Sequence, residues 1–379
     1  MVARIKFREV RGIDRRRGVG VKKKTIEFSR RLSSSALLSL AAFAGALIFT
    51  SIILWVAGAQ PGLTFQKIIQ GAFGDNIKIA NGLVVWAPLS LISGALIITF
   101  TAGLWNLGIE GQIMLGAIFT TWSMRLLENS ALSPTIIIIL SCLMGIVGGA
   151  LWASLTGVLR LYGGVSEIFA GVGLNFVATA LSLWLIFGPW KRPGVGSMSG
   201  TQPFDEKLWL VQIPGYRLSI WSLLLVIVVF IGLFILLKKT RFGIQIKAIG
   251  KNLEAARLMG IQTRKVMMLA MLFCGGIAGL AGALQVVGVY HRLIPSISSG
   301  YGFLAMLVAM LANNDFFLTL IVAYLFSILN IGGIQLPIDL HLDSTLSGVL
   351  QAALVLFFLI INGIKQRLLG RKERTVDGE

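Results

Sequence analysis

Long apolar runs, separated by short polar or turn-rich breaks, make up most of this chain. Most of these runs have about 18–25 residues, the length that a helix needs to cross roughly 30 Å of hydrocarbon. They cover residues 36–58, 80–103, 107–127, 134–159, 167–188, 217–237, 266–289, 300–313, 316–333 and 345–364. The pattern therefore predicts an all-α, polytopic transmembrane bundle of about ten spans, or of eight spans with additional re-entrant segments.

The composition supports a membrane protein. Of the 379 residues, 56% are hydrophobic and only 13% are charged, whereas a soluble domain carries about 25% charged residues. A single soluble core cannot bury this much apolar surface, because cores stop growing near 250–300 residues. The two cysteines, Cys142 and Cys274, lie inside apolar runs. They indicate small hydrophobic side chains rather than a disulfide framework.

The positive charge is concentrated in three places, although the whole chain carries a net charge of +18. These are a basic N-terminal segment (1–35), the loop 238–265 and the tail 365–379, which flank a transmembrane permease domain at 36–364. The positive-inside rule predicts that all three are cytoplasmic, and that they contact membrane lipids rather than nucleic acid. We therefore expect an N-in, C-in protein in the cytoplasmic (inner) membrane.

The same orientation makes the Pro- and Gly-rich loop 189–216 extracytoplasmic. Proline and glycine prevent a continuing helix there, and tryptophans stand near both margins, as expected at the headgroup level. Two interpretations stay open at this point. The loop either only connects two spans, or it offers a landing surface to an external partner.

Small residues recur at helical spacing in two of the predicted spans. The first stripe contains Gly145, Gly149 and Gly157, and the second contains Gly275 and Gly279. Such faces let helices approach closely in lipid. The two stretches follow a cysteine and run in opposite directions in the predicted topology. This similarity suggests an inverted repeat, a common plan among transporters, although glycine-rich helices also resemble one another by chance.

The sequence contains no motif that indicates an enzyme, a metal site or a cofactor. Its two histidines, His291 and His341, fall in short outer loops without metal-ligand spacing. The stretch Gly250-Lys251-Asn252 lacks the upstream glycine and the final serine or threonine of a phosphate-binding loop. We therefore expect no ATP hydrolysis by this chain itself.

Polar residues at membrane depth mark the expected solute pathway. An ionisable side chain near a bilayer centre costs about 2.5–3.5 kcal/mol, so it should face protein or water. Asn106 and Glu110 stand four residues apart and are expected on one helical face. Glu167 begins a second stripe, for which a favourable helix start is the alternative interpretation. The predicted pathway residues are Trp105, Asn106, Glu110, Gln112, Glu167 and Asn175.

A short apolar segment occurs late in the chain. Residues 301–312 span only about 18 Å as a helix, and Asn313-Asn314-Asp315 ends the run. Short or broken apolar segments in both halves of a transporter point to its solute path. The stretches 103–112 and 300–315 are the candidate pair, and ordinary helices joined by short loops are the alternative.

The loop 238–265 contains the signals of a short helix. Asn252 can cap it, Glu254 lies in its first turn and Gly260 ends it. A short amphipathic helix in a cytoplasmic loop suits docking into a groove of a partner protein. The predicted docking residues are Asn252, Glu254, Ala255, Ala256, Arg257 and Gly260.

These residues resemble a known family. Glu254-Ala255-Ala256 followed by Gly260 resembles the cytoplasmic EAA loop of ABC importer permeases, the coupling helix that fits the ATPase subunit. The flanking stretch 248–257 resembles the branched-chain amino acid, ribose and nucleoside group, and 105–112 looks like its nucleoside (simple-sugar type) pattern. The stretch 164–174 is also similar to this group, but its residues 166–170 (Ser-Glu-Ile-Phe-Ala) differ from the sequence that is commoner there. The resemblance covers roughly residues 36–364.

The resemblance implies the permease subunit of an ATP-binding cassette importer, with energy supplied by a separate ATPase subunit. Further implied partners are a second permease subunit, identical or similar, and an extracytoplasmic solute-binding lipoprotein. The expected solute is a nucleoside or a similar small polar molecule. Simple sugars of the ribose or galactose type and riboflavin remain alternatives. An ion-coupled secondary transporter is the rival class, and a membrane enzyme or scaffold is the third.

Overall fold

The computed structural model describes residues 44–194, 200–340, 342–343 and 345–376, and these contain helices and no strand. The chain forms two compact units, Met1–Pro61 with Val349–Glu379 and, between them, Gly62–Gly348. The basic segment 1–35 and His341 lie outside the described residues. The protein is thus all-helical over the part that is described.

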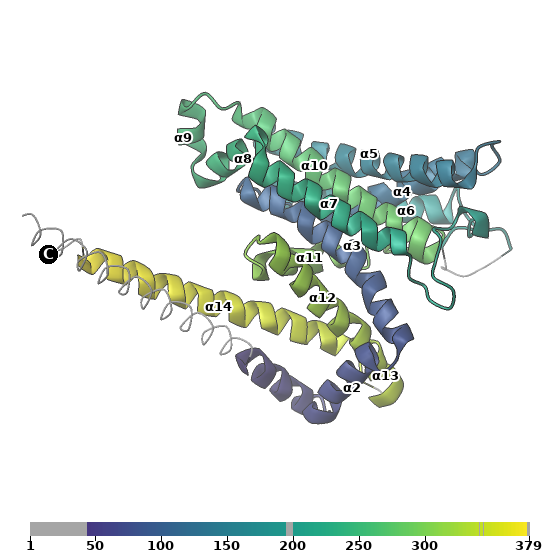
Figure 1. Cartoon of the computed structure of the whole chain (residues 1–379), viewed down its shortest axis with the longest axis horizontal. Helices are drawn as coiled ribbons and strands as arrows, with labels where there is room; N and C mark the ends of the chain where they lie inside the picture. Colours follow the sequence, from purple (N-terminus) through teal and green to yellow (C-terminus); the bar gives the residue numbers. More distant parts are fainter. Residues whose placement is uncertain (1–43, 195–199, 341, 344, 377–379) are drawn as a thin grey trace, which may run out of the picture. The chain divides into compact units, whose positions relative to one another are not determined.

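The larger unit contains most of the helices, and most of the last helix, α14, belongs to the smaller unit. Figure 1 labels the helices along the chain. In chain order the elements are α2 (Pro61–Phe73), α3 (Asn76–Thr101), α4 (Ile109–Leu127), α5 (Pro134–Leu161), α6 (Glu167–Phe187), the 3₁₀ turn η1 (Glu206–Leu208), α7 (Ile220–Lys239), α8 (Arg241–Lys251), α9 (Leu253–Leu258), α10 (Thr263–Leu284), the π-helical η2 (Gln285–Tyr290), α11 (Tyr301–Leu311), α12 (Phe316–Gly333), α13 (Gln335–Leu340) and α14 (Thr345–Val376).

Six described helical segments are long and apolar enough to cross a membrane, and a seventh span results if the helix Ala44–Val56 and α2 form one broken span. The six are Asn76–Thr101, Pro134–Leu161, Glu167–Phe187, Ile220–Lys239, Thr263–Tyr290 and Phe316–Leu340. The predicted count of about ten is not confirmed, because α11 and the apolar part of α14 are short and α4 carries polar residues. The orientation and the internal repeat stay predictions.

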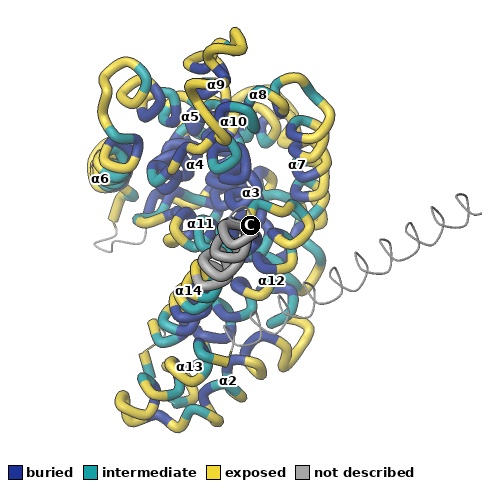
Figure 2. The backbone as a smooth tube through the Cα atoms, turned by 90° about the vertical axis from the view of Figure 1, so that its left-hand side faces the viewer, coloured by how far each residue is buried: buried dark blue, intermediate teal, exposed yellow. Residues whose placement is uncertain are grey.

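Helices α3, α4, α5 and α10 run alongside one another and form the centre of this unit (Figure 1). Most of α3 and α10 is buried, whereas α6 and α7 leave most of their residues at least partly exposed (Figure 2). The exposed residues on these outer helices include large apolar side chains such as Phe176, Trp184 and Val228. In a membrane protein, such side chains face lipid or another subunit.

The two glycine stripes lie at the crossing of α4, α5 and α10. A Cβ atom added to Gly149 of α5 would lie 2.6 Å from the Cα of Gly279 on α10. One added to Gly116 of α4 would lie 2.7 Å from the carbonyl carbon of Gly279. Gly145 and Gly275 have similarly close neighbours, and Gly157 faces the Met268 side chain. Backbone therefore touches backbone where these three helices cross.

In the smaller unit, the helix Ala44–Val56 packs against α14 at Phe357. The rings of Phe49 and Phe357 lie 5.9 Å apart between centroids. A Cβ atom at Gly45 would stand 2.7 Å from Cδ1 of Phe357. The first and last described helices thus pair through an aromatic side chain that fills the space over a glycine.

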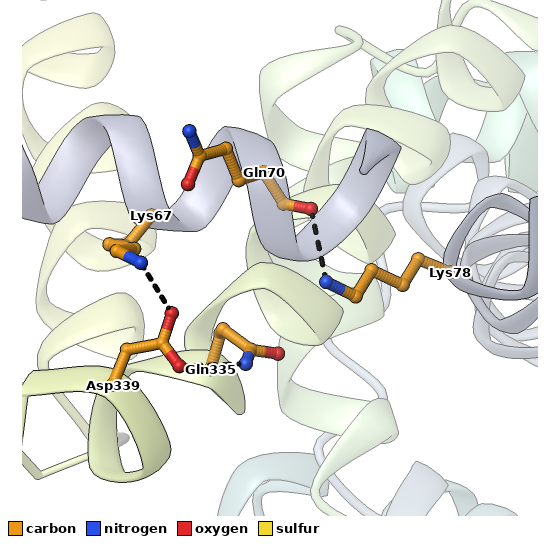
Figure 3. Close-up of polar contacts among 5 residues, drawn as sticks. All are labelled: Lys67, Gln70, Lys78, Gln335 and Asp339. Carbon is orange, nitrogen blue, oxygen red and sulfur yellow. Dashed lines mark hydrogen bonds and ion pairs between the residues drawn. The ribbon is translucent and has the colours of Figure 1, made fainter. Parts of the chain in front are cut away.

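Polar contacts tie α2 to α13 within the larger unit (Figure 3). The Lys67 ammonium lies 2.8 Å from the Asp339 carboxylate, and the Gln335 amide donates to the same carboxylate at 3.1 Å. Lys78 donates from Nζ to the carbonyl oxygen of Gln70 at 3.5 Å. These contacts are partly exposed, so they fix the position of α2 more than they stabilise the fold.

Candidate functional site

The chain between α3 and α4 is not helical, although both neighbours are. Helix α3 ends at Thr101 and α4 begins at Ile109. Gly103 has a φ of +75°, a left-handed conformation that glycine adopts without a steric penalty. Non-helical backbone at membrane depth is tolerated only where protein or a water-filled cavity covers it. We call residues 102–108 the α3–α4 break.

Asn106 and Gln112 form a closed pair inside this region, and neither side chain is exposed. The Asn106 amide donates to Gln112 Oε1 at 3.0 Å, and the Gln112 amide donates back to Asn106 Oδ1 at 2.9 Å. Asn106 Nδ2 also lies 3.2 Å from the Cys274 sulfur on α10. The prediction that Asn106 and Glu110 share one helical face is wrong, because Gly103 ends the helix and Asn106 lies before α4.

Helix α6 supplies hydrogen bonds that the break cannot make for itself. Asn175 Oδ1 accepts from the backbone N–H of Gly111 at 2.8 Å, and its amide donates to the Leu107 carbonyl at 2.8 Å. Backbone groups left unpaired at membrane depth are costly. Asn175 therefore holds the C-terminal end of the break and the first turn of α4 against α6, and this residue of the sequence stripe does face the break.

Glu167, the other polar member of that stripe, has a local partner. It is the first residue of α6, and its carboxylate lies 2.9 Å from Nε of Arg160 at the end of α5. Acidic residues are favoured at helix N-termini. This geometry favours the alternative interpretation for Glu167, a charge at a helix start.

Glu110 connects the break to the short helix α11. Its side chain is only 4% exposed, and Oε1 accepts from the backbone N–H groups of Gly302 at 2.8 Å and Phe303 at 3.2 Å. The first N–H groups of a helix have no intrahelical acceptor and carry the positive end of its dipole. Glu110 thus acts as a distant cap for α11, which has Gly300 at its N-cap and no side-chain cap of its own.

Trp105 lies at the edge of this polar cluster. Its side chain is 43% exposed, and its ring contacts Phe100 with centroids 5.4 Å apart. The structure therefore brings four predicted pathway residues around the break, namely Asn106, Glu110, Gln112 and Asn175. Trp105 stays on the surface beside them, and Glu167 pairs elsewhere.

The predicted short helix in the loop 238–265 is confirmed as α9. Asn252 Oδ1 accepts from the backbone N–H of Ala255 at 2.9 Å, and Gly260 has a φ of +79° just beyond the helix. Ala256 is buried, whereas Leu258 and Met259 are 88% and 78% exposed. The capped turn thus holds two large apolar side chains in solvent, on a fixed backbone.

Helix α8, which directly precedes α9 in the chain, contacts the residues around the α3–α4 break. Gly250 of α8 packs against the Thr101 carbonyl, and a Cβ atom at Gly103 would stand 3.5 Å from the Gly250 Cα. Ala102, Leu104, Ile249 and Ala256 belong to one buried hydrophobic cluster. A displacement of α8 and α9 therefore reaches the break through direct contacts.

At the other end of α10, the described part of the predicted loop 189–216 folds back onto η2. Phe204 N–H donates to the His291 carbonyl and Leu210 N–H to the Val287 carbonyl, both at 2.9 Å. The Trp209 ring stacks on the His291 ring with centroids 3.8 Å apart. Burial lowers the pKa of His291, so the stacked imidazole is neutral at pH 7.

Known proteins match this chain over most of its length. Residues 78–359 match the family described as branched-chain amino acid transport system / permease component. The chain is 28% identical to a glucose ABC transporter permease protein of Haloferax volcanii, over 82% of each chain. It is 27% identical to the guanosine ABC transporter permease protein NupP of Bacillus subtilis, over 86% of this chain and 93% of that protein. It is 26% identical to the nucleoside ABC transporter permease protein NupB of Lactococcus lactis, over 86% of this chain and 90% of that protein.

Proposed function

We propose that this chain, which belongs to the family of branched-chain amino acid transport system permease components, is the membrane-spanning subunit of an ABC importer for nucleosides. The family match over residues 78–359 carries the permease assignment. Relatives named for guanosine and for nucleosides support the solute class. The resemblance of residues 105–112 to the nucleoside-type pattern points the same way.

Permeases of ABC importers work with an ATPase and a solute-binding protein. For this chain we infer that the ATPase docks on the α8–α9 end, where the loop 238–265 is rich in lysine and arginine and therefore cytoplasmic. Leu258 and Met259 are the exposed anchors there. A second permease subunit completes the pathway, and an external lipoprotein delivers the solute to the opposite end.

We infer that transport proceeds by a population shift between two conformations of the bundle, one open to the inside and one open to the outside. Closure of the ATPase pair moves α8 and α9, and Gly250 passes that movement to Thr101 and Gly103. Asn175 holds the C-terminal end of the break against α6 while the break moves. Glu110 then carries the displacement to the N-terminus of α11, because its carboxylate is bonded to that backbone.

A sugar permease is the second candidate function. It is favoured by one specific observation, the 28% identity to a permease protein named for glucose. Sugars and nucleosides share hydroxyl groups that amide side chains recognise, so the fold alone does not separate them. Uptake measurements distinguish the two solute classes.

ATP-driven accumulation of nucleosides is the first expected result. Proteoliposomes containing this permease, its partner permease and its ATPase, with ATP on the ATPase side, should concentrate radiolabelled guanosine or uridine when the binding protein is added. Excess unlabelled nucleoside should compete, and glucose or ribose should not. Accumulation of glucose alone would support the second candidate. Accumulation without an ATPase, driven by a proton or sodium gradient, would contradict the ABC assignment.

Leu258→Asp with Met259→Asp should uncouple the permease from its ATPase. Both side chains are mostly exposed, so the double variant is expected to fold, and charged groups at an apolar docking site disrupt binding strongly. We expect at least about a tenfold loss of ATPase that copurifies with the permease, and a similar loss of uptake. Val211→Asp, at a site that is 71% exposed near the opposite end, is the matched control. Full copurification in the double variant would exclude α9 as the docking element.

A further inference from the structure

A cavity with several polar side chains in its wall lies next to α11, away from the residues that the sequence singled out. Its volume is about 370 Å³, within the range of pockets that hold small molecules. It is lined by Asn81, Val84 and Val85 of α3, Arg217, Gln285, Val289 and Tyr290 of η2, Ser299, Tyr301 of α11, and Asn330, Ile331 and Ile334. None of the predicted pathway residues is among them.

The π-helical turn η2 builds one wall of this cavity. Its first residue, Gln285, is only 2% exposed, and its side chain is hydrogen-bonded to the Tyr301 hydroxyl. That bond uses only part of the capacity of an amide, which offers two donors and one acceptor oxygen. Single π-helical turns inside α-helices are frequent at functional sites. The widened turn therefore places an amide with spare hydrogen-bonding capacity on the cavity wall.

The polar groups of the wall disfavour a positively charged solute. Asn81, Gln285 and Asn330 contribute amides, while Tyr290 and Tyr301 contribute aromatic rings with hydroxyl groups. No carboxylate stands among the described residues that line the cavity. A free amino acid would bring an ammonium group that lacks a counter-charge here, at a considerable desolvation cost. The edges of a base and the hydroxyls of a ribose instead match amides, and a flat ring packs well on tyrosine.

Arg217 stands at the same place and is exposed. It also lines two neighbouring hollows, one of them beside Gln212 and Tyr216, and no ion pair involves it among the described residues. Its guanidinium group offers five donors in a planar fork. Donors in that arrangement suit the carbonyl oxygens of a purine or pyrimidine, and they repel a cationic solute.

We propose that this cavity is the nucleoside-binding station of the permease, with Asn81, Gln285 and Asn330 as its amide contacts and Tyr290 and Tyr301 as its stacking surfaces. The inference rests on the proposed function and assigns it a place in the chain. Tyr301 directly precedes Gly302, whose N–H is held by Glu110. A displacement of the α3–α4 break therefore changes the wall of the station, which links solute release to the ATPase.

Photolabelling of the whole transporter tests this assignment. Membranes containing the permease, its partner permease and its ATPase are irradiated with radiolabelled 8-azidoadenosine, without the binding protein. The label should fall on peptides that contain Tyr290 or Tyr301, with protection by excess guanosine and none by glucose. Asn330→Ala and Gln285→Ala should each lower the labelling about 5- to 10-fold, as expected for one lost hydrogen bond.

Ser327→Ala is the matched control, because Ser327 lies on α12 one turn before Asn330, bonds only within its own helix and does not line the cavity. Labelling of other peptides, or full labelling of both amide variants, would overturn the station while nucleoside uptake by the wild type still upholds the proposed function. A wild-type transporter that takes up glucose and no nucleoside would instead overturn the proposed solute, and the nucleoside assignment of the cavity with it.

Discussion

Glu110→Ala is expected to reduce ATP-driven uptake to background while ATP hydrolysis continues. The substitution leaves the buried N–H groups of Gly302 and Phe303 without their acceptor, at about 1–3 kcal/mol for each. Helix α11 has no side-chain cap to replace the carboxylate, so its first turn is expected to detach from α4. Uptake, ATPase rate and the response of that rate to solute and binding protein are measured in proteoliposomes.

A coupling role and a purely structural role for Glu110 predict different results. Glu110→Gln retains an acceptor oxygen for the same two N–H groups, so it should recover a large part of the uptake. In Glu110→Ala, the ATPase rate should no longer respond to solute, which general damage to the fold would not produce selectively. Glu167→Ala is the control, because it removes a carboxylate from the neighbouring α6 whose partner Arg160 is partly exposed. Normal uptake by Glu110→Ala would remove the proposed link between the break and α11.

Gly279→Leu is expected to prevent the permease from folding. Gly279 faces Gly149 across the α5–α10 contact, where even a Cβ atom would stand 3.0 Å from the Gly149 Cα and close to the Gly145 carbonyl. Four additional carbon atoms cannot be placed without separating the helices, and overpacking of this kind costs about 1–3 kcal/mol or more. The yield of monodisperse protein in detergent and its thermal stability measure the effect.

Two further variants, a smaller substitution at the same position and a control at an open position, test the same helix contact. Gly279→Ala adds only one carbon atom, so it should fold but unfold about 5 °C below the wild type. Gly232→Leu on α7 is the control, because nothing lies within 4 Å of a Cβ atom there and the residue is exposed. A Gly279→Leu permease as stable as the control would show that the close contact of α5 and α10 contributes nothing to the fold.

The sequence predicted those helices well whose ends carry local signals. The run 134–159 matches α5 because Pro134 begins it, and 316–333 matches α12 because Asp315 caps it. The sequence did not show that α4 and α11 differ from full membrane spans. Apolar periodicity reports how a segment contacts its surroundings, and it does not distinguish lipid from the buried interior of the same bundle. The polar helix α4, the short helix α11 and the short apolar part of α14 were therefore counted as full spans.

In the candidate site, too, contacts between residues close in sequence were predictable, and contacts between distant residues were not. The cap of α9 was predictable because Asn252 and Gly260 lie within one short stretch. The contact of Glu110 with Gly302 joins residues that are 192 positions apart, and no local pattern predicts it. Gln285 and Asn330 were missed, although a single amide inside an apolar run is itself a signal of a functional position.

The touching backbones of α4, α5 and α10 also limit how the permease can open. Elements that slide past one another usually do so through a layer of side chains that changes rotamer, and the crossing at Gly116, Gly149 and Gly279 has none. These three helices must therefore tilt as one rigid frame. The gates of the solute path then belong to elements outside that frame, and α11, whose first turn is capped by the Glu110 carboxylate of α4, is the candidate for a moving gate.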